Sequence, residues 1–97
     1  MTKFIITYHG SGSPDPSERE SAMAAFGAWL ASTGDSVIDP GAPTRPAAQV
    51  GAETDLVPIG GYTILEADSV EAAQALLAGH PFVTRGGTLQ INEVMGV

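Results

Sequence analysis

Apolar and polar positions follow two periods along this chain, one typical of strands and one typical of helices. Short runs of apolar and β-favouring residues predict four strands. Between them, apolar side chains recur every three or four residues in two places, from Ala22 to Leu30 and from Ala72 to Leu77, which predicts two helices. In chain order we predict a strand at residues 4–8, a helix at 16–32, strands at 36–39 and 62–67, a helix from about 69 to 78, and a strand at 88–95.

Polar clusters predict where these helices begin. Residues 15–18 read Asp-Pro-Ser-Glu, in which the aspartate can accept hydrogen bonds from free amides and the glutamate completes a capping box. Ser17 with Glu20 offers an overlapping cap, which leaves the first residue of the helix open by about two positions. Residues 68–71, Asp-Ser-Val-Glu, predict a second capping box.

The stretch between the two halves has a different character. Residues 40–58 contain four prolines and show little periodicity, so we predict a long loop or flap there. The order is therefore strand-helix-strand, long loop, strand-helix-strand, which is the signature of a split-βαβ, ferredoxin-like fold. We expect residues 1–97 to form one α+β domain, a β-α-β-β-α-β sandwich whose four-stranded antiparallel sheet carries two helices on one face. We also expect strands one and three to lie at its centre and to run parallel, with strand two antiparallel to strand one.

The predicted central strands are apolar on both faces. Phe4 and Ile6 alternate with Ile5 on the first strand, and Ile64 alternates with Leu65 on the third. Two helices can bury one face, whereas an apolar sheet face left in water calls for a partner. We therefore expect a homodimer in which two copies pack through their sheet faces.

The charge and composition of the chain argue against nucleic acid and membranes as partners. The net charge is −7 with only four lysines and arginines, so the chain lacks the basic footprint that nucleic acid requires, and an anionic membrane surface would repel it. No apolar run approaches the roughly 20 residues of a membrane helix. There is no cysteine, which excludes disulfides and thiolate chemistry. The N-terminus lacks the pattern of a signal peptide, and we expect a cytoplasmic protein.

Three segments resemble the YCII-related family, including its branch named for a DGPF tetrapeptide: residues 29–41, 61–73 and 87–95. The resemblance implies a dimeric α/β barrel with a cleft between sheet, helix and partner. Some members carry a His and Asp pair proposed to be catalytic, with the His on the first helix. Here that helix contains no histidine and the tetrapeptide is absent, so the resemblance implies the fold more strongly than an activity.

Four residues are candidates for a site. His9 follows the first predicted strand, where a histidine can act as acid or base near neutral pH, although an inert loop histidine explains the pattern as well. Asp39 ends the second strand and could orient His9, or simply bond to the Pro-Gly turn that follows. We take His9 and Asp39 as catalytic candidates, and Tyr8 and Glu66 as ligand-binding candidates. His80 suits a structural role as a cation near the end of the second helix.

Other chemistry is not indicated. The two histidines and the carboxylates lack metal-ligand spacing, no dinucleotide fingerprint follows the first strand, and we predict neither metal nor cofactor. Two functions remain. The first is a small domain that binds or transforms a metabolite in a cleft beside the sheet. The alternative is a non-catalytic dimerisation or accessory module.

Overall fold

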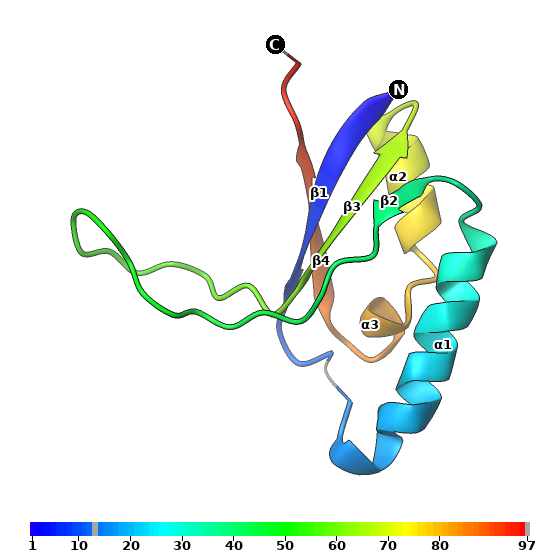
Figure 1. Ribbon diagram of the computed structural model, residues 1–97, viewed down its shortest axis with the longest axis horizontal. Coiled ribbons are helices and arrows are strands. Elements are labelled where there is room, and N and C mark those ends of the chain that lie inside the picture. The colour runs from blue at the N-terminus through cyan, green and yellow to red at the C-terminus, as the bar shows by residue number, and fades with distance from the viewer. Residues whose placement is uncertain (13, 97) are drawn as a thin grey trace.

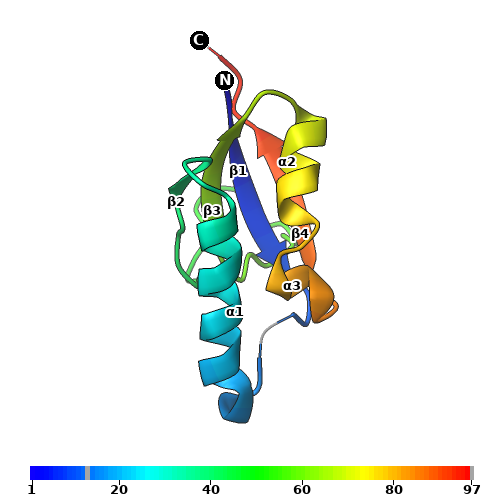
Figure 2. The same cartoon turned by 90° about the vertical axis from the view of Figure 1, so that its right-hand side faces the viewer.

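Four antiparallel strands form one sheet, and the helices lie together on one of its faces (Figure 1 and Figure 2). This arrangement is seen in a computed structural model that describes residues 1–12 and 14–96. The strand order is β2-β3-β1-β4. The elements are β1 (Thr2–His9), a 3₁₀ turn (Pro16–Glu18), α1 (Arg19–Ser32), β2 (Val37–Asp39), β3 (Tyr62–Ala67), α2 (Val70–Leu77), α3 (Pro81–Thr84) and β4 (Thr88–Glu93). The predicted ferredoxin-like α+β sandwich is confirmed.

The directions of the strands differ from the expectation in one respect. Strands β1 and β3 are central, but they run antiparallel, with Thr2 opposite Ala67 and Thr7 opposite Tyr62. Strand β2 is also antiparallel to β3, so β1 and β2 point the same way. The expected parallel pair was wrong, because β1 and β3 are direct neighbours in an antiparallel ladder. As a consequence, β2 and β1 end toward the same end of the sheet.

The core lies between the sheet and the helices. Phe4 and Ile6 of β1 and Leu65 of β3 are fully buried on this face. They pack with Trp29 of α1 and Leu77 of α2. Burying each of the larger aliphatic or aromatic side chains contributes about 1.5–3 kcal/mol, so this layer accounts for much of the stability of the domain. It also fixes which residues of β1 face the helices and which face away.

The helix starts agree only in part with the predicted caps. At α2, Ser69 is the N-cap, and its hydroxyl oxygen accepts a hydrogen bond from the amide of Ala72 at 3.1 Å. At α1, a 3₁₀ turn precedes the helix, and neither Asp15 nor Glu18 makes a side-chain cap. The first predicted capping box was therefore wrong, and the second begins one residue later than predicted.

A short helix, α3, was not predicted at all. Residues 80–83 looked like a connection, but Pro81 occupies the first helical position, and the side chain of His80 accepts a hydrogen bond from the amide of Phe82 at 3.0 Å. Proline suits that position because its missing N–H would have no partner there anyway. Four residues are too few for a helical period to show in the sequence.

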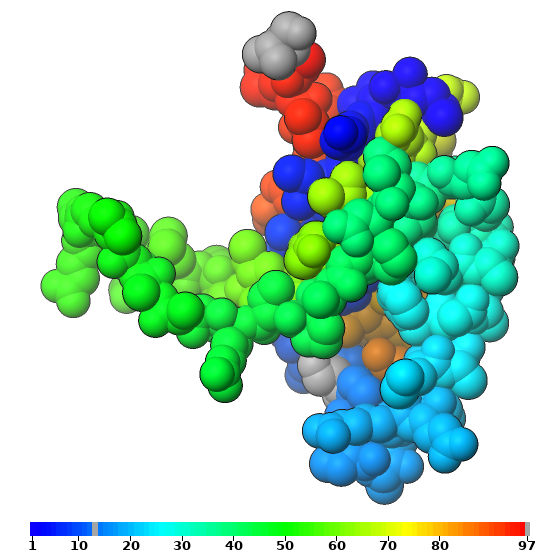
Figure 3. Space-filling view, in the orientation of Figure 1, coloured from blue at the N-terminus to red at the C-terminus, as the bar shows by residue number. Residues whose placement is uncertain are grey.

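The long loop is present as an extended arm, which we define as residues 42–60. It leaves the sheet on the side opposite the helices and projects far from the body of the molecule (Figure 1 and Figure 3). Pro43 bridges to Gly61 at its base. Just before it, Gly41 has a positive φ of 78° and lies so close to the carbonyl of Tyr62 that a Cβ would collide with it. Glycine is therefore required where the arm begins.

Candidate functional site

A cavity of about 710 Å³ opens on the face of the sheet that the helices leave uncovered, beside the base of the arm. We call it the open-face cleft. Its size lies within the range of roughly 300–1,000 Å³ that small-molecule sites occupy. The lining comes from β1 and the residue after it, from β4 and from the arm: Ile5, Thr7, His9, Gly10, Val57, Ile59, Thr88, Gln90 and Asn92.

The alternation of strand residues places these side chains together. Because successive side chains of a strand point to opposite faces, burying Phe4 and Ile6 under the helices turns Thr7 and His9 to the open face. On the neighbouring strand, His9 lies opposite Thr88 and Thr7 lies opposite Gln90. The register of β1 against β4 therefore sets the polar wall of the open-face cleft.

His9 is held in a defined orientation. Its Nδ1 lies 2.8 Å from the carbonyl oxygen of Pro58, and its Nε2 lies 2.7 Å from the hydroxyl of Thr7. A carbonyl oxygen can only accept, so Nδ1 carries the proton and donates to Pro58. In the neutral ring Nε2 is then the acceptor, and the hydroxyl of Thr7 donates to it. A hydroxyl, a basic ring nitrogen and an acceptor behind the ring form the arrangement from which general acid–base chemistry is built.

Amide side chains continue the polar wall along β4. The side-chain amide of Asn92 donates to the carbonyl oxygen of Ile5 at 3.0 Å, and that of Gln90 donates to the side-chain oxygen of Asn92 at 2.9 Å. Across from them, Val57 and Ile59 of the arm supply apolar surface. The open-face cleft thus has one polar and one apolar side, which suits a small ligand of mixed character.

The structure does not bring Asp39 to His9 within one chain. Asp39 lies opposite Ile64 on β3, which separates β2 from β1, and its carboxylate accepts a hydrogen bond from the amide of Gly41 at 2.9 Å. That is the local turn interaction expected of an aspartate before Pro-Gly. The nitrogens of His9 are already engaged by Thr7 and Pro58.

Tyr8 lies on the other face of the sheet from His9. Its hydroxyl is 2.6 Å from that of Thr63 and 2.8 Å from Nε2 of His80. Because Nδ1 of His80 accepts from a backbone amide, Nε2 carries the proton and donates to Tyr8. Tyr8 then donates to Thr63, which donates to the carbonyl of Pro40 at 2.9 Å. Burial raises the pKa of the Tyr8 phenol, against an opposite effect of its bond to Thr63. We call this series of bonds the buried chain.

His80 is not the cation that the sequence suggested near the end of the second helix. Only 2% of its surface is exposed, and its ring packs against Trp29 with 4.4 Å between ring centroids. Burial, with the positive charge of Arg85 acting in the same direction, lowers the pKa of His80 to about 4. It is therefore neutral at physiological pH, and its role is to cap α3 and to begin the buried chain.

Glu66 faces the open side but lies far from His9. In the strand register Glu66 lies opposite Lys3, whereas Tyr62, at the other end of β3, lies opposite Thr7. Lys3 and His9 are six positions apart on β1, which is about 20 Å along a strand. The sequence offered His9 as a candidate but did not indicate Thr7 and Pro58, which contact its two ring nitrogens. The alternation of Thr88, Gln90 and Asn92 indicated a polar face on β4, but nothing in the sequence indicated that this face borders His9.

The part of the chain that the structure describes has neither a metal-binding cluster nor a helix that could span a membrane. Across residues 1–12 and 14–96, His, Asp and Glu side chains do not gather in groups of three or more that could hold a metal ion. None of the helices in these ranges has the length and apolar character needed to cross a membrane.

Comparison with known proteins identifies the class. The profile of the YCII-related domain matches residues 1–96, so this chain belongs to the YCII-related family. No curated protein matches it. Among solved structures, it is similar to 5-chloro-2-hydroxyhydroquinone dehydrochlorinase (TftG) from Burkholderia phenoliruptrix AC1100, in complex with 2,5-dihydroxybenzoquinone. The TM-score is 0.54 with 23% identity, over 93% of this chain and 91% of that one. This likeness supports the fold.

Proposed function

We propose that this chain binds a small molecule in the open-face cleft and uses His9 to move a proton on it. The observation that carries the proposal is the hydrogen-bonded series Thr7–His9–Pro58 on the wall of a cavity of about 710 Å³. A ligand hydroxyl that takes the place of the Thr7 hydroxyl would donate its proton to Nε2. The carbonyl of Pro58 would then stabilise the imidazolium through its bond to Nδ1.

The lining of the cleft supports a class of ligand. Amides and hydroxyls on one side, with Ile5, Val57 and Ile59 as apolar surface, suit a small ring that carries hydroxyl or carbonyl groups. The structure of the similar dehydrochlorinase is a complex with 2,5-dihydroxybenzoquinone, a ligand of this chemistry. We use that compound as the first probe.

A thermal-shift experiment tests the proposal. A ligand at a hundred times its dissociation constant stabilises the native state by about 2.7 kcal/mol, so binding of 2,5-dihydroxybenzoquinone or of related dihydroxy aromatic compounds should raise the melting temperature. His9→Gln should abolish the rise. Glu66→Gln, on the same face but far along the sheet, should retain it. A rise of equal size in His9→Gln would refute the site.

We also propose that the open face is covered by a second copy of the chain. Ile5 and Ile38 are 40% and 47% exposed in the single chain. Burial of such a face against an identical one would remove apolar surface from water and roof the cleft. Dimerisation alone, without catalysis, is the second candidate function, and the exposed face is the observation that favours it.

A further inference from the structure

The single chain exposes more surface than its size requires. Its accessible surface is 6663 Å², whereas a folded monomer of 9.9 kDa is expected to expose about 5,200 Å². The excess is roughly 1,500 Å², and a standard interface buries about 800 Å² on each partner. The radius of gyration, 14.2 Å, likewise exceeds the value of about 12.5 Å for a domain of this length. The chain therefore has the surface of a subunit rather than of a monomer.

Much of this surface belongs to the arm, which projects from the body (Figure 3). The outgoing and returning segments of the arm are hydrogen-bonded at its base. There the amide of Thr44 donates to the carbonyl oxygen of Gly60 at 3.1 Å, and its hydroxyl donates to the carbonyl oxygen of Ile59 at 2.6 Å. Beyond the base the arm carries exposed apolar side chains. Leu56 is 65% exposed and does not line the open-face cleft, unlike its neighbour Val57. Large apolar side chains exposed in this way are candidates for burial against a partner.

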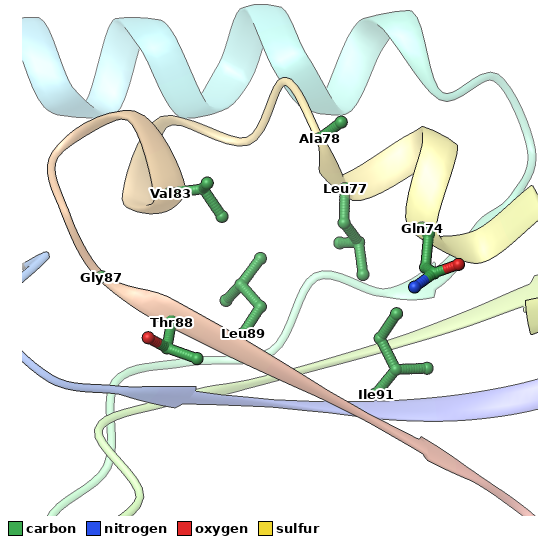
Figure 4. A pocket seen from close by; sticks show the side chains of 8 residues that line it. All are labelled: Gln74, Leu77, Ala78, Val83, Gly87, Thr88, Leu89 and Ile91. Atoms are coloured by element: carbon green, nitrogen blue, oxygen red, sulfur yellow. The ribbon is translucent and has the colours of Figure 1, made fainter. Parts of the chain in front are cut away.

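A groove on the flank of the molecule could receive it. This flank groove, of about 320 Å³, lies between α2, α3 and β4, which is an edge strand of the sheet. The side chains of Leu77, Val83, Leu89 and Ile91 converge on it (Figure 4). Its polar side chains are those of Gln74 and Thr88.

We propose that in the homodimer the arm of each chain passes the open edge of its partner and places Leu56 in the partner's flank groove. The inference rests on the sheet-face dimer proposed above. A two-fold axis that runs parallel to the strands, between the two sheets, sets the β2 edge of one chain beside the β4 edge of the other. The arm joins β2 to β3, so its base lies in the half of the sheet that faces the partner's β4.

The level and the reach of the arm also fit. The base of the arm lies beside the end of β1, since the amide of Gly60 donates to the carbonyl oxygen of Tyr8. At that end β4 begins, with Thr88 opposite His9, and Thr88 and Leu89 line the flank groove. Packed sheets lie about 10 Å apart. Leu56 is five residues before Gly61, which allows a reach of roughly 17 Å in an extended chain. That maximum reach exceeds the spacing of packed sheets, so Leu56 can extend to the layer in which the partner's flank groove lies.

Disulfide trapping tests this contact without interference, because the chain contains no cysteine of its own. In the double variant Leu56→Cys/Val83→Cys, mild oxidation should give a covalent dimer closed by two disulfides. The matched control is Leu56→Cys/Ala75→Cys, whose second thiol is exposed on α2 outside the flank groove. It should cross-link at least tenfold more slowly.

Each other outcome overturns the inference. An intrachain disulfide would mean that the arm folds back on its own chain, and a ladder of higher oligomers would mean that the exchange is not closed by a two-fold axis. Equal rates in the two variants, or a Val83→Cys thiol that stays freely reactive in the dimer, would leave the flank groove open to another occupant. Light scattering on the unmodified chain separates the two proposals. A monomer would refute the sheet-face dimer, whereas a dimer that does not cross-link would refute only the docking of the arm.

Discussion

At the scale of single residues, the two histidines of this chain have opposite environments. His9 lies on the open face with Thr7 and Pro58 at its nitrogens, and His80 lies under α1 in the buried chain. The hydrogen-bond directions in the buried chain follow from one backbone amide, that of Phe82, which can only donate. Each member therefore has a fixed role, and loss of one leaves a buried neighbour without a partner.

Removal of the Tyr8 hydroxyl should show this cost. Tyr8→Phe leaves the Nε2–H of His80 and the oxygen of Thr63 unpaired in the interior, so we expect a loss of about 1–3 kcal/mol in the free energy of unfolding. Urea denaturation measures it. The matched control is Tyr62→Phe, a half-buried tyrosine on the next strand whose side chain lies on the open face. Equal losses in both variants would contradict the importance of the buried chain.

The buried chain also predicts a pH dependence. The pKa of His80 is lowered to about 4 in the folded state, against about 6.5 in an unfolded chain. Between these values the unfolded state binds a proton that the folded state does not. The free energy of unfolding therefore falls as the pH falls from 6.5 toward 4, by up to about 3 kcal/mol from this residue alone.

Chemical denaturation at a series of pH values checks this slope. His80→Gln, or His80→Asn if the glutamine variant does not fold, should reduce it. An undiminished slope without His80 would show that other groups cause it. Sequence could not reveal this residue, because its burial depends on Trp29 and Tyr8, which are distant in the chain. His9 was accessible to prediction, since the end of a strand shows in the local pattern.

At the scale of elements, the local pattern of apolar and polar residues predicted the elements that depend on local interactions. The four strands and the two longer helices follow from periods of two and of three to four residues, and these were recovered. Helix starts were less accessible, because several side chains can serve as a cap and packing chooses among them. The direction of β1 against β3 depends on how the two halves assemble, and the expectation on this point failed.

The two predicted helix starts provide a paired experiment. Ser69→Ala removes the side-chain acceptor for the amide of Ala72 and should lower the free energy of unfolding by about 1 kcal/mol. Asp15→Ala removes no side-chain cap and should have little effect. Thermal and urea unfolding of both variants measure the difference. A larger loss in Asp15→Ala would restore the capping box that the sequence suggested.

At the scale of the whole molecule, the exposed sheet face and the arm together call for a partner. A positive charge on that face should separate the copies, because it would be buried without a counter-charge at the centre of the interface. Ile5→Lys is therefore expected to give a species of 9.9 kDa in light scattering, and the unmodified chain is expected to give twice that mass. Met23→Lys, on the exposed surface of α1, is the control and should remain dimeric.

The open-face cleft as the ligand site is tested most directly by nuclear magnetic resonance, because the chain has only two histidines. Their ring signals can be assigned with His9→Gln and His80→Gln. On titration with 2,5-dihydroxybenzoquinone or a related dihydroxy aromatic compound, the His9 signals should shift saturably while those of His80 stay in place. A compound that binds and shifts His80, or that binds and moves neither ring, would contradict the assignment of the site to the open face.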